Sequence, residues 1–158
     1  MKYAICPGEE FYAKMLQQCR SDAERAVVML LWRTGMHSST LCSGEWAQTG
    51  TIIHWQRTKN SKWLRATVSI SEASVIEQCV IAGSLPVNQN ILRRWLARIG
   101  ARAGYAEQRV SPLTFRHSRA VWLMDQGMPG HRVAAMLGCS FAVLEKHYAQ
   151  LEASRLVG

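Results

Sequence analysis

The apolar residues of this chain change their spacing twice, and this change limits the possible folds more than any other feature of the sequence. Helical spacing ends at Gly35, and Thr51–Gln56 is rich in β-forming residues. Lys59–Lys62 has the composition of a turn, and within Leu64–Ile70 apolar residues alternate with polar ones. Helical spacing then returns. The pattern predicts an antiparallel hairpin, with Lys59 at or near its tip, inside an otherwise helical chain.

Capping residues and glycines mark where the expected helices begin and end. Ser21 and Glu24 form a capping-box pattern, and Gly35 is a typical helix stop. Pro112 follows a serine, which is typical of the first helical position. With their capping residues, the expected helices cover residues 9–19, 21–34, 71–82, 88–102, 111–126, 129–137 and 140–154.

A chain of 158 residues, 48% of them hydrophobic, is long enough for one domain with a substantial core. We expect a mainly α (α+β) domain over residues 1–158, with about six or seven helices and a small antiparallel hairpin or sheet near residues 51–70.

The longest apolar run, Ala26–Trp32, is too short for a membrane helix, which needs about 20 residues. The first residues lack the long apolar stretch of a secretory signal. The five cysteines are odd in number and never spaced as Cys-x-x-Cys, so we expect reduced thiols in the cytoplasm and no zinc site.

The net charge of +8 is concentrated in the second half of the chain. Residues 1–92 carry nine basic and seven acidic side chains, whereas residues 93–158 carry ten and four. Between Arg93 and Arg119 there are seven arginines and a single acid. Such a cluster indicates a polyanionic partner, most often nucleic acid; the alternative is a solvated basic face that maintains solubility. Three of these arginines recur every four residues along one edge of an expected helix: Arg94, Arg98 and Arg102.

The most informative segment is Ser111–His117, which reads Ser-Pro-Leu-Thr-Phe-Arg-His. Gly138 follows 22 residues after Arg116, and Tyr148 lies ten residues past Gly138. Here the sequence resembles the catalytic domain of the tyrosine recombinases, the phage integrase family. In that family a His-x-x-Arg-His segment opens one helix, a Leu-Gly-His-Ser segment closes another, and the nucleophilic Tyr lies ten residues past that Gly.

Two upstream segments extend the resemblance. Leu31–Leu41 is similar to the family's first motif, in which Thr-Gly-Leu-Arg-x-Ser-Glu-Leu follows apolar residues. Arg57-Thr-Lys-Asn60 is similar to the β-hairpin that carries the family's catalytic Lys. The resemblance covers about residues 20–155.

The resemblance implies a DNA-cleaving chemistry that needs no metal and no nucleotide cofactor. A Tyr hydroxyl attacks a DNA phosphodiester and forms a 3′-phosphotyrosyl link, which conserves the bond energy for religation. Two Arg and a His or Trp bind the non-bridging oxygens as charge builds there, and a Lys protonates the departing 5′ oxygen.

Three of the six active positions keep the family's residue. The resemblance assigns the nucleophile to Tyr148, the second Arg to Arg116 and the Lys to Lys59. Each has a plainer alternative, in which Tyr148 packs its helix against the core, Arg116 pairs within the fold and Lys59 is solvated. Further DNA contacts are expected from six basic residues: Arg57, Arg94, Arg98, Arg102, His117 and Arg119.

The other three active positions have changed. The family's first Arg falls on His37, the His of the His-x-x-Arg segment on Leu113, and the His after the glycine on Cys139. The acidic residue of the first motif is Thr40. His37 can partly replace an Arg because a neighbouring phosphate favours the imidazolium form, whereas Leu113 donates no hydrogen bond and Cys139 only a weak one.

The sequence therefore predicts a double-stranded DNA-binding protein with an altered and impaired active site, a regulatory relative of a recombinase. One alternative is an active site-specific recombinase with an unusual phosphate-binding set. A third interpretation is a protein-interaction module that keeps the fold without binding DNA. The expected partners are double-stranded DNA and a second copy, or a separate chain that supplies the N-terminal DNA-binding domain that this chain is expected to lack. No cofactor, metal or membrane is expected.

Overall fold

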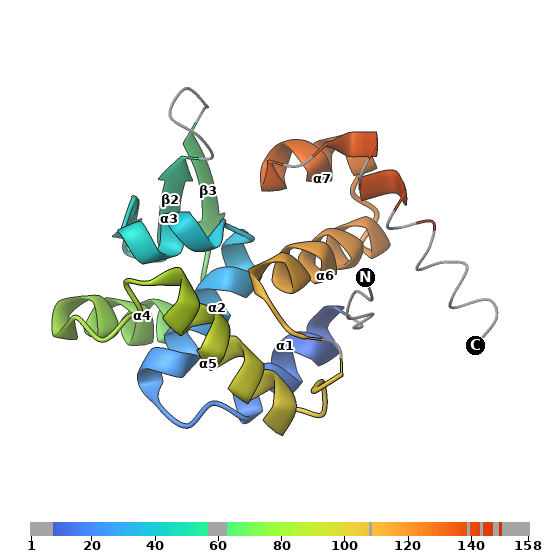
Figure 1. Ribbon diagram of the computed structural model, residues 1–158. Coiled ribbons are helices and arrows are strands. Elements are labelled where there is room, and N and C mark those ends of the chain that lie inside the picture. The colour runs from blue at the N-terminus through green and yellow to red at the C-terminus, as the bar shows by residue number, and fades with distance from the viewer. Residues whose placement is uncertain are drawn as a thin grey trace.

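A computed structural model describes residues 8–56, 63–107, 109–138, 140–142, 144–146 and 149. The described part is mainly helical and contains a three-stranded antiparallel sheet (Figure 1), which confirms the predicted fold class. None of its helices is long and apolar enough to cross a membrane. In chain order the elements are α1 (Gly8–Gln17), α2 (Asp22–Thr34), α3 (Ser38–Ser43), β1 (Trp46–Thr49), β2 (Ile52–Gln56), β3 (Trp63–Thr67), α4 (Ile70–Ala82), α5 (Gln89–Arg102), α6 (Pro112–Asp125) and α7 (Gly130–Leu137).

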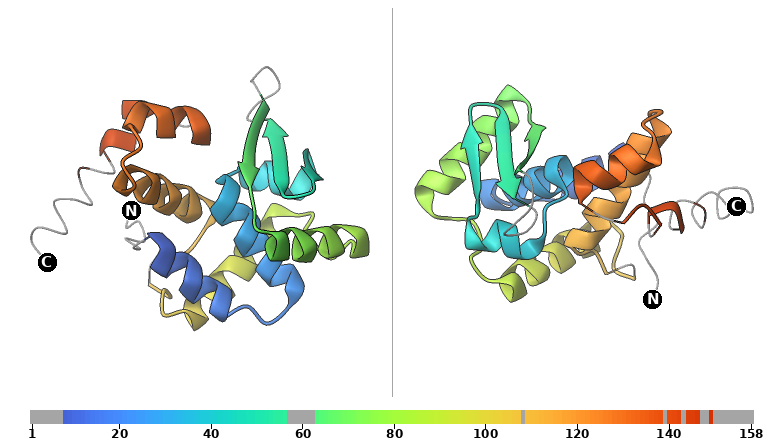
Figure 2. Two further views of the ribbon diagram at one scale, coloured as in Figure 1. Left: turned by 180° about the vertical axis from the view of Figure 1, so that it is seen from behind. Right: turned by 90° about the horizontal axis from the view of Figure 1, so that it is seen from above.

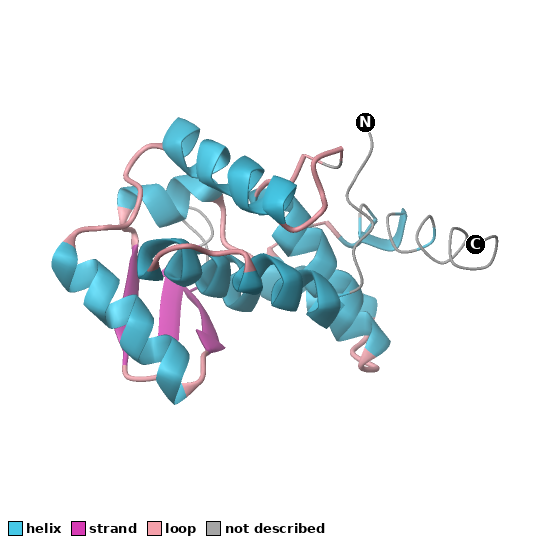
Figure 3. Cartoon of the chain, turned by 90° about the horizontal axis from the view of Figure 1, so that it is seen from below, coloured by secondary structure: helices cyan, strands magenta, loops and turns pink. Residues whose placement is uncertain are grey.

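The sheet lies at one end of the molecule, with its strands in the order β1-β2-β3 (Figures 2 and 3). Ile53 and Trp55 of the central strand are buried, and Ile53 lies opposite Ala66 of β3. The sheet begins at Trp46, earlier than predicted. The four residues of β1 alternate between half-buried and exposed, and its one large apolar side chain is too little to indicate a strand.

Helix α4 also begins earlier than predicted, because Ser69 caps it in place of Ser71. The Ser69 hydroxyl accepts a hydrogen bond of 3.1 Å from the Glu72 N–H, and the Glu72 carboxylate accepts one of 2.8 Å from the Ser69 N–H. This reciprocal cap needs an acid or amide three residues after the serine, which Ser69 has and Ser71 lacks. Ile70 therefore starts the helix, 82% exposed, and does not continue the strand.

The other boundaries lie within about two residues of those predicted, and α3 is, besides β1, an element that the sequence did not predict. Helix α3 was not predicted, because six residues are too few to show a helical period. The expected final helix lies partly outside the described residues; residues 141–142, 144–146 and 149 are helical.

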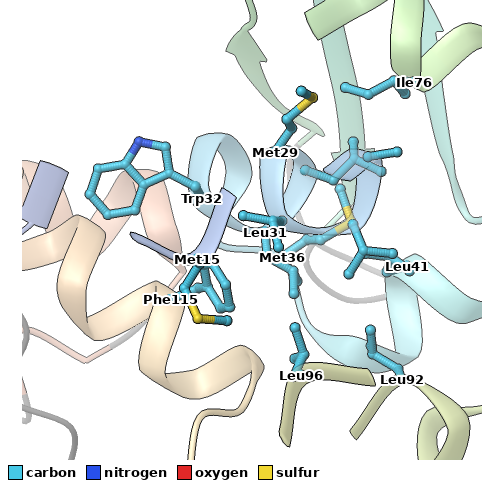
Figure 4. Close-up of a cluster of buried hydrophobic side chains, with 14 of the residues drawn as sticks. Met15, Met29, Leu31, Trp32, Met36, Leu41, Ile76, Leu92, Leu96 and Phe115 are labelled. Carbon is cyan, nitrogen blue, oxygen red and sulfur yellow. The ribbon is translucent and has the colours of Figure 1, made fainter. Parts of the chain in front are cut away.

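Helix α2 lies at the centre of the fold. All residues of Ala26–Trp32 are buried, which explains the longest apolar run of the sequence. Helices α1, α4 and α6 and strand β3 pack against α2. The surrounding elements contribute buried side chains to the same core (Figure 4): Met15, Leu41, Ile76, Leu92, Leu96 and Phe115.

Candidate nucleic-acid interface

Arg116 lies in the first half of α6 and binds the turn that ends α2. Its Nε–H donates a hydrogen bond of 3.0 Å to the carbonyl oxygen of Gly35, and only 8% of the residue's surface is exposed. Because the guanidinium donors lie in one rigid plane, fixing Nε orients the whole group. The contact joins the segment predicted to bind DNA phosphate to the first motif, 81 residues earlier in the chain.

The Gly35 turn also meets the end of α7. A Cβ atom added to Gly35 would lie 2.8 Å from Leu137 Cδ2 and 3.8 Å from Arg116 Cγ. Leu137 is in turn buried with Leu123 and Val133 in a cluster that α6 and α7 share. Three segments that are distant in sequence thus pack together at Gly35: the α2–α3 turn, α6 and the end of α7.

Residues on both sides of Gly35 hold this turn. Gly35 ends α2 in the left-handed conformation (φ 65°), and its N–H donates to the Leu31 carbonyl at 2.9 Å. Thr34 Oγ1 donates to the Leu30 carbonyl at 2.6 Å and accepts from the Met36 N–H at 3.1 Å. The Met36 side chain is buried in the main core (Figure 4). The sequence identified Gly35 as a helix stop, but it did not reveal that the Gly35 carbonyl binds Arg116. The only local signal at this position was the Thr-Gly pair at the end of the helix.

His37 lies on the same turn, two residues beyond Gly35. It is exposed at the N-cap position of α3 and makes no side-chain capping bond to that helix. The next residue, Ser38, donates from Oγ to Gln89 Oε1 at 2.8 Å, so the first turn of α5 lies beside this turn. The position that corresponds to the family's first Arg is therefore close in sequence and structure to the carbonyl that binds Arg116.

Leu113 occupies the first turn of α6, one turn before Arg116. Its side chain is 42% exposed. An aliphatic side chain has no hydrogen-bond donor, so this position offers nothing to a phosphate oxygen. Thr40, at the position of the family's acidic residue, is buried in α3.

Four of the predicted site residues lie outside the described residues: Arg57, Lys59, Cys139 and Tyr148. Strand β2 ends at Gln56 and pairs with β3 from Trp63. Cys139 comes two residues after Leu137. The roles assigned to these four residues stay predictions.

Arg102 is bound within the fold. Its Nη2 forms an ion pair of 2.8 Å with Glu24, and its Nε donates to the Gln18 carbonyl at 2.9 Å. Both side chains of the pair are largely buried, so the contact ties the end of α5 to the start of α2. We infer a structural role for Arg102 from these contacts, and its DNA contact stays a prediction. Glu24 consequently does not close the expected capping box: Ser21 Oγ accepts from the Glu24 N–H, but the Glu24 carboxylate accepts from the Arg20 N–H.

The guanidinium of Arg119 lies beside two indole rings that contact each other. Its Cζ lies 5.2 Å from the ring centroid of Trp32 and 4.6 Å from that of Trp122. Burial and, to a lesser extent, the nearby charge of Arg33 lower the pKa of Arg119 to about 10. Its Nη1 is buried and has no hydrogen-bond partner among the described residues. We infer a structural role for Arg119, too, from these surroundings, and its DNA contact stays a prediction.

Arg94 and Arg98 have different surroundings. Both are exposed on α5, on the side opposite its buried residues Leu92 and Leu96. The remaining predicted DNA contact, His117, is half-buried on α6. The exposed arginines of α5 are thus available to a large ligand, and their helix begins beside the His37 turn.

A separate apolar cavity of about 480 Å³ lies between the α3–β1 segment, the end of α4 and the α4–α5 loop. Trp46, Ile81 and Val87 are among its lining residues, and none of the predicted site residues lines it.

Among the described residues, no group of three or more His, Cys, Asp or Glu could hold a metal ion. Burial raises the pKa of Cys19 to about 12 and also raises that of Cys42, so both thiols are protonated at neutral pH.

Comparisons with known proteins agree with this fold. The structure is similar to XerA recombinase, with a TM-score of 0.74 and 15% identity over 94% of this chain and 61% of that one. It is similar to XerH site-specific recombinase bound to palindromic difH substrate in a post-cleavage complex (TM-score 0.72, 17% identity, 96% of this chain and 50% of that one). It is also similar to the Tn1549 transposon integrase in complex with transposon right-end DNA (TM-score 0.56, 14% identity, 95% of this chain and 64% of that one). A comparison with curated protein sequences finds no match.

This chain spans between 50% and 64% of the length of these three structures. At 14–17% identity, the similarity to these three structures shows a shared fold and no more. The family model of the phage integrases matches residues 9–155, almost the whole chain and all four motif segments noted in the sequence. The chain therefore belongs to the phage integrase family, the tyrosine recombinases.

Proposed function

We propose that this chain binds double-stranded DNA through Arg116, His37 and the exposed arginines of α5, and that its strand-cleaving chemistry is impaired. The net charge of +8, concentrated after residue 92, supports a polyanionic partner. Two of the similar structures, those of XerH and of the Tn1549 integrase, are complexes with DNA.

The observation that carries the proposal is the bond from Arg116 to the Gly35 carbonyl. An oriented guanidinium loses less conformational freedom when it binds a phosphate, and its flat array of donors matches phosphate oxygens. The bond also brings Arg116 to the turn that carries His37, the other cation expected to bind the phosphate.

The impaired chemistry is inferred from the surroundings of Arg116. Leu113 is exposed one turn away, where the family has a histidine, and it can stabilise no charge on a phosphate oxygen. Loss of one preorganised donor lowers a rate by about 10²–10³. Three active positions differ from the family pattern. Because these side chains would act together on one phosphate, their effects on the cleavage rate do not simply multiply, and the total loss of rate must be measured.

A titration of DNA binding against salt tests the first half of the proposal. The affinity for a random-sequence duplex should fall about 100-fold between roughly 50 and 200 mM salt if about four phosphates are bound. Arg116→Gln should lower the affinity about tenfold, as expected for one charge-assisted contact. The matched control is Arg25→Gln, because Arg25 is ion-paired with Asp22 at the far end of α2. An affinity that does not respond to salt would contradict DNA binding and favour a protein-interaction module.

The second candidate function is an active site-specific recombinase that forms a 3′-phosphotyrosyl intermediate through Tyr148. The oriented Arg116 favours it, together with the presence of Tyr148 and Lys59 in the sequence. The two functions differ in one observable, a covalent DNA adduct that is lost in Tyr148→Phe.

A further inference from the structure

Gly35 makes two contacts that Gly83, another left-handed glycine at the end of a helix, does not. Its carbonyl accepts the Arg116 Nε–H, and its α-carbon faces Leu137. Gly83 ends α4 with almost the same conformation (φ 66° against 65°), yet a Cβ at Gly83 would meet nothing within 4 Å. The left-handed turn alone therefore does not account for the environment of Gly35.

We propose that Gly35 is a positioning residue for Arg116. Its carbonyl sets the plane of the guanidinium, and the lack of a Cβ lets Leu137 close over the turn and keep that carbonyl in place. The inference rests on the proposed role of Arg116 in binding a DNA phosphate. Gly35 touches no DNA in this account; it acts through Arg116.

The neighbours of Gly35 make the carbonyl a rigid acceptor. The Gly35 N–H is bonded to Leu31, and the Thr34 hydroxyl bridges the Leu30 carbonyl and the Met36 N–H. With the peptide groups on both sides fixed, the carbonyl cannot rotate toward a different donor without breaking the end of α2.

A single added methyl group should disturb this arrangement. In Gly35→Ala the new Cβ would lie 2.8 Å from Leu137 Cδ2, closer than real Cβ contacts allow, so the turn or Leu137 must move. Movement of the turn displaces the carbonyl from Arg116 Nε, whereas movement of Leu137 removes the side chain that packs over the turn. Gly83→Ala is the matched control, because it imposes the same backbone strain without a steric contact.

The first measurement is the NMR signal of the arginine Nε–H groups in the ¹⁵N-labelled full chain, with the Arg116 signal assigned by its absence in Arg116→Lys. In the wild-type protein the Arg116 Nε–H should exchange slowly with solvent, whereas those of Arg94 and Arg98 should exchange fast. Exchange of the Arg116 Nε–H as fast as that of Arg98 would overturn the proposal without any variant. In Gly35→Ala the Arg116 signal should shift and lose protection, while the Arg102 signal, bonded to Gln18, should stay protected.

A second variant tests the steric contact between Gly35 and Leu137. Leu137→Val removes the Cδ2 atom that the new Cβ would meet, so protection of the Arg116 Nε–H should return at least partly in Gly35→Ala/Leu137→Val. The same double variant serves if Gly35→Ala alone is too unstable to study. A folded Gly35→Ala protein with an unchanged Arg116 signal would show that Gly35 does not position it.

The second measurement is the salt dependence of DNA binding. Loss of one phosphate contact should reduce the slope of log affinity against log salt by about one, equally in Gly35→Ala and Arg116→Gln. The variant with both changes should lose no more than either single variant, because both remove the same contact. A wild-type slope in Gly35→Ala would overturn the positioning role. Failure of the wild-type protein to bind DNA would contradict the proposed function, while the Nε–H signals would still decide whether Gly35 holds Arg116.

Discussion

Arg116 and Arg119 lie one turn apart on α6 and have different surroundings. Arg116 binds a carbonyl on the turn that leads to the exposed His37. Arg119 is enclosed by Trp32 from α2 and by Trp122 from its own helix. Charge counting cannot separate the two, since both fall in the same arginine-rich stretch. What separates them is the tertiary position of Trp32, which lies far away in the sequence.

Arg119→Lys tests the structural assignment of Arg119. Lysine keeps the positive charge but lacks the flat guanidinium that packs against both rings, so the free energy of unfolding should fall by about 1 kcal/mol. The DNA affinity of the folded variant should equal that of the wild-type protein. Denaturant unfolding and the DNA titration measure the two quantities.

The exposed Arg98→Lys is the control, and its effect on stability should stay below about 0.5 kcal/mol. A lower DNA affinity in Arg119→Lys at unchanged stability would instead restore Arg119 to the DNA-binding set.

The first turn of α4 connects three helices through one carboxylate. The Glu72 carboxylate accepts hydrogen bonds from the Ser69 N–H and from the Tyr12 hydroxyl of α1, and it forms an ion pair of 3.2 Å with Arg33 of α2. Burial alone would raise the pKa of Glu72, but the bonds from Tyr12 and Ser69 and the charge of Arg33 outweigh it and hold that pKa below its ordinary value. Burial and the nearby carboxylate raise the pKa of Tyr12. The Glu72 carboxylate is therefore a stabilising link only while it is ionised.

Because Glu72 must be ionised to make these contacts, we expect the free energy of unfolding to fall at acidic pH. The folded-state pKa of Glu72 lies below its unfolded value of about 4.3, so the unfolded chain binds the proton more readily. The stabilisation is complete above that unfolded value and is lost as the pH falls through the folded one. Glu72→Gln should lower the free energy of unfolding at pH 7 by about 2 kcal/mol, because charged hydrogen bonds are lost. The difference between the two proteins should narrow below about pH 4, and a difference that stayed constant with pH would show that the carboxylate charge is not responsible.

Local sequence signals predicted most elements, and the misses share a cause. Asn88 and Ser111 were identified as caps because their side chains and positions are typical of helix starts, and both helices begin there. Helix α3 and strand β1 have six and four residues, too few for a period to appear. They are fixed by tertiary contacts, such as the bond from Ser38 to Gln89, that no local pattern contains.

For the whole molecule, the sequence predicted the family better than it predicted the contacts of individual arginines. The motif spacing led to the family, which the family model and the fold confirm. The pairing of Arg116 with Gly35 could not be predicted, because it depends on how α6 crosses the end of α2. The same packing of helices explains why Arg102, regularly spaced with Arg94 and Arg98, is turned toward Glu24.

The central claim is that this member of the phage integrase family binds DNA without cleaving it efficiently. The most direct test incubates the full chain with a pool of random-sequence duplexes that carry a nick, which traps a covalent intermediate by releasing the short cleaved strand. Bound DNA is then read on a native gel and covalent adduct on a denaturing gel. The account predicts salt-sensitive binding with no more adduct than Tyr148→Phe forms. A Tyr148-dependent adduct at substantial yield would contradict the impaired chemistry and establish the chain as a working recombinase.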